Sequence, residues 1–129
     1  MTIWQEVLKE YEAEVYDAAI VSPPCNTFSR VLLANPQGPK LLRDRANPRG
    51  LPWLSGKGKQ KVLKHNLMVE RAITLFRLWP KMTKRPLLLL EHPEDLGVTS
   101  TGASPASIWQ WDALAEALQE AGATQGALY

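Results

Sequence analysis

The feature that most constrains the fold is a pair of short apolar segments that end at prolines. Residues 18–22 (AAIVS) stop at Pro23-Pro24, and residues 87–90 (LLLL) lie between Pro86 and the pair His92-Pro93. Leucine favours helices, but a segment this short between prolines cannot form a stable helix. Both segments therefore predict buried β-strands, and the second predicts a central strand that is buried on both faces.

Helical periodicity is found on both sides of these strands. Apolar residues recur at helical spacing over residues 3–14, with Thr2 as a candidate N-cap, and over residues 59–79, which end at Pro80. A third helix is predicted over residues 106–120, with Ser104 as N-cap, Pro105 at its first position and Gly122 at its end. Weaker patterns predict helical turns at residues 28–34 and 39–45, and a last strand at residues 127–129.

The predicted order of elements is helix, strand, long loop, helix, strand, helix, which is typical of an α/β domain. Two strands joined through a long helix imply a right-handed parallel crossover. In open α/β sheets, sites form at the carboxyl ends of the strands. Because polar residues follow both strands, we expect Cys25 and Glu91 to lie side by side.

Composition narrows the class of protein. The 129 residues suffice for a single domain (1–129), and 45% hydrophobic with 22% charged residues is the globular range. A single cysteine excludes an internal disulfide and a cysteine-cluster zinc site, and it suggests a reducing compartment, so we expect a cytoplasmic protein. No apolar run is long enough for a membrane span, and the acidic, amphipathic N-terminus does not resemble a signal peptide.

Charge is distributed very unevenly. Residues 30–64 contain nine bases and one acid, whereas residues 86–129 contain six acids and no base. The basic stretch predicts either a surface that faces nucleic acid or a solvated loop without a partner. Trp53, within this stretch, could stack on a base or anchor the loop on the core. The candidate phosphate-binding residues are Lys40, Arg43, Arg45, Arg49, Lys57, Lys59 and Lys61.

Residues 16–29 (YDAAIVSPPCNTFS) resemble the catalytic stretch of the DNA cytosine-5 methyltransferases. That stretch is an apolar strand led by aspartate, followed by Pro-Cys, a polar residue, any residue and Phe-Ser. Residues 87–93 (LLLLEHP) are similar to the later family strand that ends in Glu-Asn-Val, and Ser107 and Trp109 are similar to residues of phage and mobile-element relatives. The resemblance implies a truncated Rossmann-like methyltransferase sheet, with two to three mostly parallel strands and flanking helices.

The resemblance also implies a chemistry. Cys25 would be the nucleophile that adds to cytosine C6. Glu91 would donate to the ring near N3 or accept a hydrogen bond from the N4 amine. S-adenosylmethionine would be the methyl donor, and the DNA base would have to flip out of the duplex. The residues that the resemblance implies in substrate binding are Pro24, Asn26, Phe28, Ser29, Arg30, His92 and Pro93.

The chain departs from the family pattern in several places. It lacks the glycine-rich turn that binds the donor, the family's Gln-x-Arg-x-Arg strand and the target-recognition domain, and Glu91 is followed by His-Pro. A second chain or self-association could complete the sheet. An inactive remnant, a nucleic-acid-binding module that uses loop 40–64, and a thiol hydrolase built on Cys25 and His92 remain as alternatives.

Overall fold

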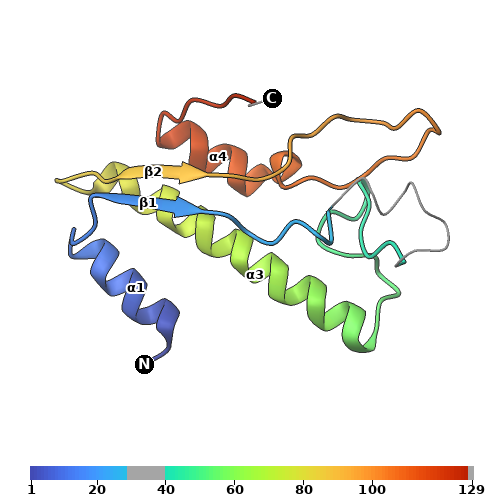
Figure 1. The fold of residues 1–129 in the computed structure, drawn as a ribbon, viewed down its shortest axis with the longest axis horizontal. Helices are drawn as coiled ribbons and strands as arrows, with labels where there is room; N and C mark the ends of the chain where they lie inside the picture. The colour runs from blue at the N-terminus through green and yellow to red at the C-terminus, as the bar shows by residue number, and fades with distance from the viewer. Residues whose placement is uncertain (29–39, 128–129) are drawn as a thin grey trace.

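The computed structural model describes residues 1–28 and 40–127. They form a small mixed α/β fold with a two-stranded parallel sheet and three α-helices (Figure 1). In chain order the elements are α1 (Ile3–Glu12), β1 (Ala18–Val21), α3 (Gly56–Leu78), the 3₁₀ turn η1 (Trp79–Lys81), β2 (Leu87–Leu90), the 3₁₀ turn η2 (Ile108–Gln110) and α4 (Asp112–Glu120). Residues 29–34 of the helical turn predicted at 28–34, residues 128–129 of the strand predicted at 127–129, and the site residues Ser29 and Arg30 lie outside the described residues.

The two predicted strands are confirmed, and they pair in parallel. Ala18 lies opposite Leu87 and Val21 lies opposite Leu90. Backbone bonds continue the pairing beyond both ends, because Leu87 N–H donates to the Asp17 carbonyl and Glu91 N–H donates to the Val21 carbonyl, both at 2.9 Å. The chain passes from β1 to β2 through α3, as a parallel pair requires.

Only one face of this sheet is covered by the described residues. Leu88 and Leu90 point to a core that α3 and α4 build with η2, whose most deeply buried side chains include Val69, Ile108 and Leu114. On the opposite face Ile20 is 74% exposed, Leu87 62% and Leu89 49%. The prediction of a central strand buried on both faces is therefore wrong, because no segment among residues 1–28 and 40–127 packs on that second face.

Helix α1 is confirmed together with its N-cap. The Thr2 hydroxyl accepts a hydrogen bond from Gln5 N–H, and the Gln5 side chain accepts one from Thr2 N–H, which forms a capping box. Tyr11 is buried, and its hydroxyl donates to the Leu75 carbonyl at 2.9 Å. The helix is thus fixed on α3, and burial raises the pKa of Tyr11 to about 12.

The last helix begins later than predicted. Ser107, not Ser104, caps a single 3₁₀ turn, and the extended backbone of Trp111 separates this turn from α4. The Trp111 side chain is buried in the core, which fixes the break. The predicted end is confirmed: Gly122 has a φ of +66°, and its N–H donates to the Gln119 carbonyl at 3.0 Å.

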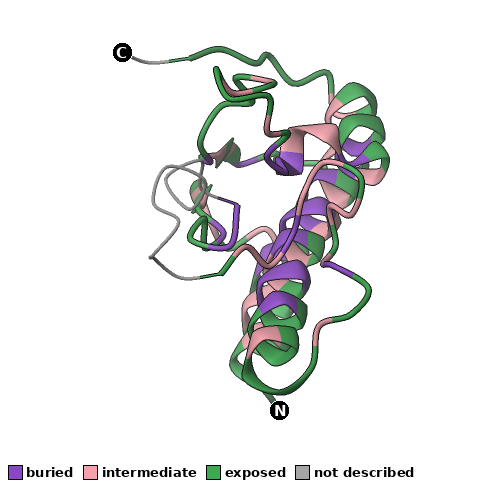
Figure 2. Cartoon of the chain, turned by 90° about the vertical axis from the view of Figure 1, so that its right-hand side faces the viewer, coloured by how far each residue is buried: buried purple, intermediate pink, exposed green. Residues whose placement is uncertain are grey.

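Residues 40–45 do not form the predicted helical turn. They run without regular structure across the molecule, so that Arg43 reaches the interior. Figure 2 colours the chain by burial. Buried segments run along α3 and in the loops beside it, and exposed segments surround them. Among the described residues no helix is both long enough and apolar enough to cross a membrane.

Candidate functional site

The parallel register brings the two polar strand ends together. Glu91 directly follows β2, and its N–H is bonded to the last residue of β1. Its carboxylate Oε2 accepts a hydrogen bond of 2.7 Å from the hydroxyl of Ser22, the residue that follows β1. Glu91 is therefore held beside Ser22, three residues before Cys25. That Cys25 and Glu91 themselves lie side by side stays a prediction.

Cys25 lies in a turn three residues beyond that bond. Pro23 is buried, whereas Pro24, Cys25 and Asn26 are exposed. Phe28 N–H donates to the Cys25 carbonyl at 2.8 Å, which closes the turn. Cys25 forms no disulfide and is exposed.

The turn is anchored from inside by Arg43. This side chain is fully buried; its Nη2 donates to Thr27 Oγ1 at 2.8 Å, and its Nη1 donates to Asn66 Oδ1 and to the Pro48 carbonyl, both at 2.7 Å. The guanidinium carbon lies 3.7 Å from the centre of the Phe28 ring. Burial lowers the pKa of Arg43 to about 10.

The prediction that Arg43 contacts phosphate is therefore wrong, because its guanidinium faces the protein interior. One feature of the sequence indicates a buried polar partner at this place. Asn66 lies on the same stripe of α3 as Val62 and Val69, at positions i, i+4 and i+7, and an amide on an apolar stripe requires a buried polar partner.

Two histidines flank this anchor. The His92 ring packs edge-on against Phe28, with ring centres 5.1 Å apart. Burial lowers the pKa of His92, and the nearby Pro24 carbonyl and Glu91 carboxylate oppose that shift without forming hydrogen bonds of normal geometry. His65 Nδ1 lies 3.2 Å from Thr27 Oγ1, and burial, with the charges of Lys61 and Arg43, lowers its pKa.

A cleft of about 200 Å³ opens next to the Phe28–His92 pair. Three residues predicted to bind substrate, Phe28, His92 and Pro93, line it together. Cys25 and Glu91 do not line it. Its other walls are Glu94, Asp95, Leu96, Pro105, Ala106 and Ser107.

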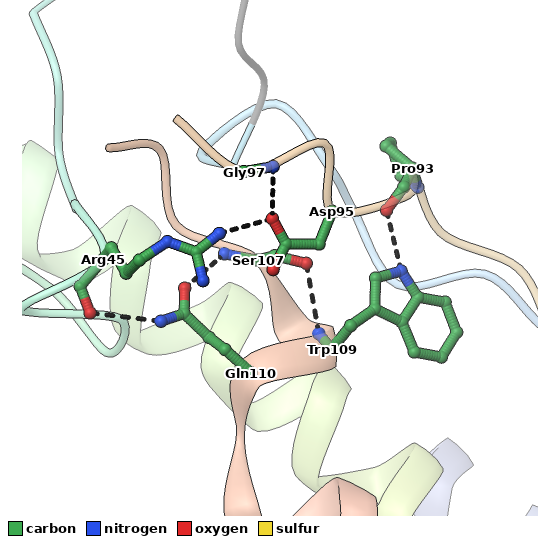
Figure 3. A network of polar contacts seen from close by, with 7 residues as sticks. All are labelled: Arg45, Pro93, Asp95, Gly97, Ser107, Trp109 and Gln110. Atoms are coloured by element: carbon green, nitrogen blue, oxygen red, sulfur yellow. Dashed lines mark hydrogen bonds and ion pairs between the residues drawn. The ribbon is translucent and has the colours of Figure 1, made fainter. Parts of the chain in front are cut away.

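A polar network holds the far wall of this cleft (Figure 3). Arg45 forms an ion pair with Asp95, and the Arg45 carbonyl accepts a bond of 3.1 Å from Gln110 Nε2. Trp109 Nε1 donates to the Pro93 carbonyl at 2.8 Å, which joins η2 to the segment after β2. Arg45, predicted to contact phosphate, thus serves to fix the wall of the cleft.

The remaining basic residues divide into two groups. Arg49 pairs with Glu70 at 2.7 Å, and its guanidinium carbon lies 4.1 Å from the Trp111 ring centre. Four predicted phosphate contacts are exposed and form no ion pair within the described part of the chain: Lys40, Lys57, Lys59 and Lys61. Figure 1 shows that the lysine-bearing end of α3 lies toward the end of the sheet to which both strands point.

The described residues do not fit the methyl donor that the resemblance implies. A donor site of that kind needs a glycine turn directly after a strand. Here β1 is followed by Ser22-Pro23-Pro24 and β2 by Glu91-His92-Pro93. The glycines with positive φ lie elsewhere, at Gly50, Gly56, Gly97, Gly102 and Gly122.

In the described part of the chain, no group of three or more metal-ligating side chains is close enough to hold an ion.

Comparison of the chain with protein-family models, with curated proteins and with solved structures gave no match. The arrangement itself offers an exposed thiol, a carboxylate held at the adjacent strand end, and a cleft with an aromatic wall.

Proposed function

We propose that this chain is the catalytic half of a DNA cytosine-5 methyltransferase-like enzyme, with Cys25 as nucleophile and Glu91 as proton donor. The observation that carries the proposal is the parallel register, which aligns Glu91 with the segment that ends at Cys25. The same two residues carry the resemblance in sequence. The donor site, which the described residues do not provide, would come from another chain or a second copy.

The step that this chain can perform is addition to the base. The Cys25 thiolate forms an S–C6 bond, the C5–C6 π electrons become a C4–C5 π bond, and the C4–N3 π electrons move onto N3. A proton from the Glu91 carboxyl goes to N3, which neutralises the developing charge. The Ser22 hydroxyl holds Glu91 Oε2 at 2.7 Å, so it orients the carboxyl group for that transfer.

A covalent trap that needs no methyl donor tests this step. A duplex with 2-pyrimidinone at one position lacks the 4-amino group, so C6 is more electrophilic and a thiolate adds without methyl transfer. We expect an adduct that resists denaturation, is seen by mass spectrometry and is absent in Cys25→Ser. Absence of an adduct at DNA concentrations that saturate binding would contradict the assignment.

The role of Glu91 has its own test in the same assay. Glu91→Gln keeps the hydrogen bond from Ser22 but cannot supply the proton, so we expect the adduct to form about 10² to 10⁴ times more slowly. Glu120→Gln, an exposed acid in the last turn of α4, is the matched control and leaves the rate unchanged. Equal rates for Glu91→Gln and the control would remove Glu91 from the site.

A second candidate is a nucleic-acid-binding module without catalysis. It is favoured by the four exposed lysines and by Trp53, which is 73% exposed in the basic loop instead of anchored on the core. An exposed indole beside cations can stack on a base. Binding that is sensitive to salt but unchanged in Cys25→Ala, together with no covalent adduct, would support this function over the first.

A further inference from the structure

The cleft beside Phe28 contains two buried polar side chains with unused hydrogen-bonding capacity. His92 and Ser107 both line it, although only 8% and 6% of their surfaces are exposed. Neither ring nitrogen of His92 has a hydrogen-bond partner among the described residues. The Ser107 hydroxyl accepts a bond of 3.2 Å from Trp109 N–H and donates none within the same part of the chain. Unmet polar groups this deeply buried are rare in native proteins, so two of them in one cleft indicate a bound molecule.

The His92 ring needs a donor that the surrounding protein does not supply. The backbone groups that act on it are the carbonyls of Pro24 and Pro93, which only accept hydrogen bonds. Burial lowers the pKa of His92, so at neutral pH the ring is uncharged and carries one N–H and one acceptor nitrogen. The carbonyls can face the N–H, whereas no described group donates to the acceptor nitrogen. A ligand that satisfies His92 therefore brings a donor.

The size and the walls of the cleft limit what it can hold. Its volume of about 200 Å³ equals that of about seven waters, which is enough for one substituted ring. Much of the lining is apolar and comes from Phe28, Leu96, Pro105 and Ala106. The carboxylates of Glu94 and Asp95 disfavour an anion, and the charge of Asp95 is already paired with Arg45. The occupant that fits is an uncharged ring with polar atoms at its edge.

We propose that this cleft binds an uncharged nitrogen heterocycle with an amino group, which donates to His92 while a ring nitrogen accepts from the Ser107 hydroxyl. A plain aromatic ring would fill the volume but leave both side chains unsatisfied. A phenol, such as the tyrosine side chain of a partner protein, offers its donor and acceptor at one oxygen, whereas His92 and Ser107 belong to separate segments of the wall, after β2 and at the cap of η2. Cys25 and Glu91 do not line the cleft, so the inference is independent of the proposed function.

A titration of the full chain with 2-aminopyrimidine, followed at the histidine ring nitrogens by ¹H–¹⁵N NMR, tests the site. The acceptor nitrogen of His92 should shift upfield as it gains a hydrogen bond, and the shift should saturate with a Kd of about 0.1–10 mM, a range suited to a ligand of one ring. The nitrogens of His65, which lies outside the cleft, should not shift. The covalent trap reports on Cys25 and this titration on His92, so either result can fail while the other holds.

Two histidine variants show whether the hydrogen bond contributes to binding. His92→Phe keeps an aromatic ring against Phe28 but removes the acceptor nitrogen, so we expect 2-aminopyrimidine to bind about tenfold more weakly. His65→Phe, at the other buried histidine, is the matched control and should bind the ring as the wild type does. Circular dichroism confirms that both variants are folded, and the nitrogen shift in the wild type decides the question without them.

Other probes separate the alternative occupants. Toluene has the ring without polar atoms, and benzoate and benzylammonium add a charge of either sign, so each should bind at least about tenfold more weakly than 2-aminopyrimidine. No saturable shift at His92, equal affinity for toluene or a charged ring, or equal loss in the two histidine variants would each overturn the proposal. Tighter binding of p-cresol would also overturn it, and would assign the cleft to a tyrosine side chain of a partner protein.

Discussion

Arg43 is a buried positive charge that has no carboxylate partner among the described residues. Within the described part of the chain, its three hydrogen bonds go to Thr27, Asn66 and the Pro48 carbonyl, so one side chain joins the Cys25 turn, α3 and the loop at residues 40–50. A lysine keeps the charge but loses the planar fork that reaches all three acceptors. Arg43 therefore fixes the position of the Cys25 turn relative to α3.

We expect Arg43→Lys to lower the free energy of unfolding by about 2–4 kcal/mol, because buried acceptors lose their donors. Urea denaturation measures the change. Arg77→Lys, at an exposed position near the end of α3, is the control and should stay within about 0.5 kcal/mol of the wild type. A loss for Arg43→Lys no larger than that of the control would show that the buried fork does not stabilise the fold.

The histidines make stability depend on pH. Burial lowers the pKa of both His92 and His65 below the usual value of about 6.5, so the folded state favours neutral rings. The stabilisation is complete above pH about 6.5 and is lost as the pH falls toward the folded pKa values, because the unfolded chain takes up the protons first. We expect the free energy of unfolding to fall between pH 7.5 and 5, and to fall less steeply in His92→Gln. An equal slope in that variant would contradict a buried neutral His92.

At the scale of elements, the turn before α3 depends on a glycine. Gly50 has a φ of +126°, and a Cβ there would lie 2.8 Å from Val62 Cγ1. Gly50→Ala therefore adds backbone strain and a clash with a buried residue of α3, and we expect a loss of about 1–3 kcal/mol in thermal unfolding. Gly126→Ala, which meets nothing within 4 Å, is the control and should not change the melting temperature. Equal melting temperatures for the two variants would mean that this loop can move away from α3.

The elements that local rules define were predictable from sequence, and those that packing defines were not. Prolines on both sides fix Leu87–Leu90 as a strand, and capping residues fix the start of α1. Exposure of Leu87 and Leu89 depends on what packs above them, which no local pattern contains. Likewise Ser104 and Ser107 are both acceptable caps, and the burial of Trp111 decides between them.

The same division applies to the candidate site. Placement of Glu91 beside Ser22, at the end of β1, follows from parallel strands, so the sequence was sufficient for that much of the site. The partners of the arginines were not predictable. A basic loop rich in proline resembles a solvated loop in sequence, whichever way each side chain points. Arg43 turns inward to Asn66, Arg45 pairs with Asp95, and both partners are distant in sequence.

At the scale of the whole molecule, exposed positive charge lies at both ends of α3. Lys57, Lys59 and Lys61 are at its start, and Arg77, Lys81, Lys84 and Arg85 are at or just beyond its other end. The first turn of α3 contains no acid, so the lysines add to the positive end of the helix dipole instead of being neutralised. If Lys40, Lys57, Lys59 and Lys61 each neutralise one phosphate, the log of the binding constant for duplex DNA should fall with log salt at a slope of about −3.6. In the proposed function, the start of α3 is the surface that meets nucleic acid.

Removal of two of these charges should change the slope by a defined amount. The double variant Lys57→Gln/Lys61→Gln should reduce the slope to about −1.8, because two fewer counterions are released. Lys81→Gln/Lys84→Gln removes the same charge at the opposite end of the sheet, and it should weaken binding slightly while the slope stays near −3.6. Fluorescence anisotropy of a labelled duplex at several salt concentrations measures both. Equal slopes in the two variants would mean that net charge, and not the surface at the start of α3, governs binding.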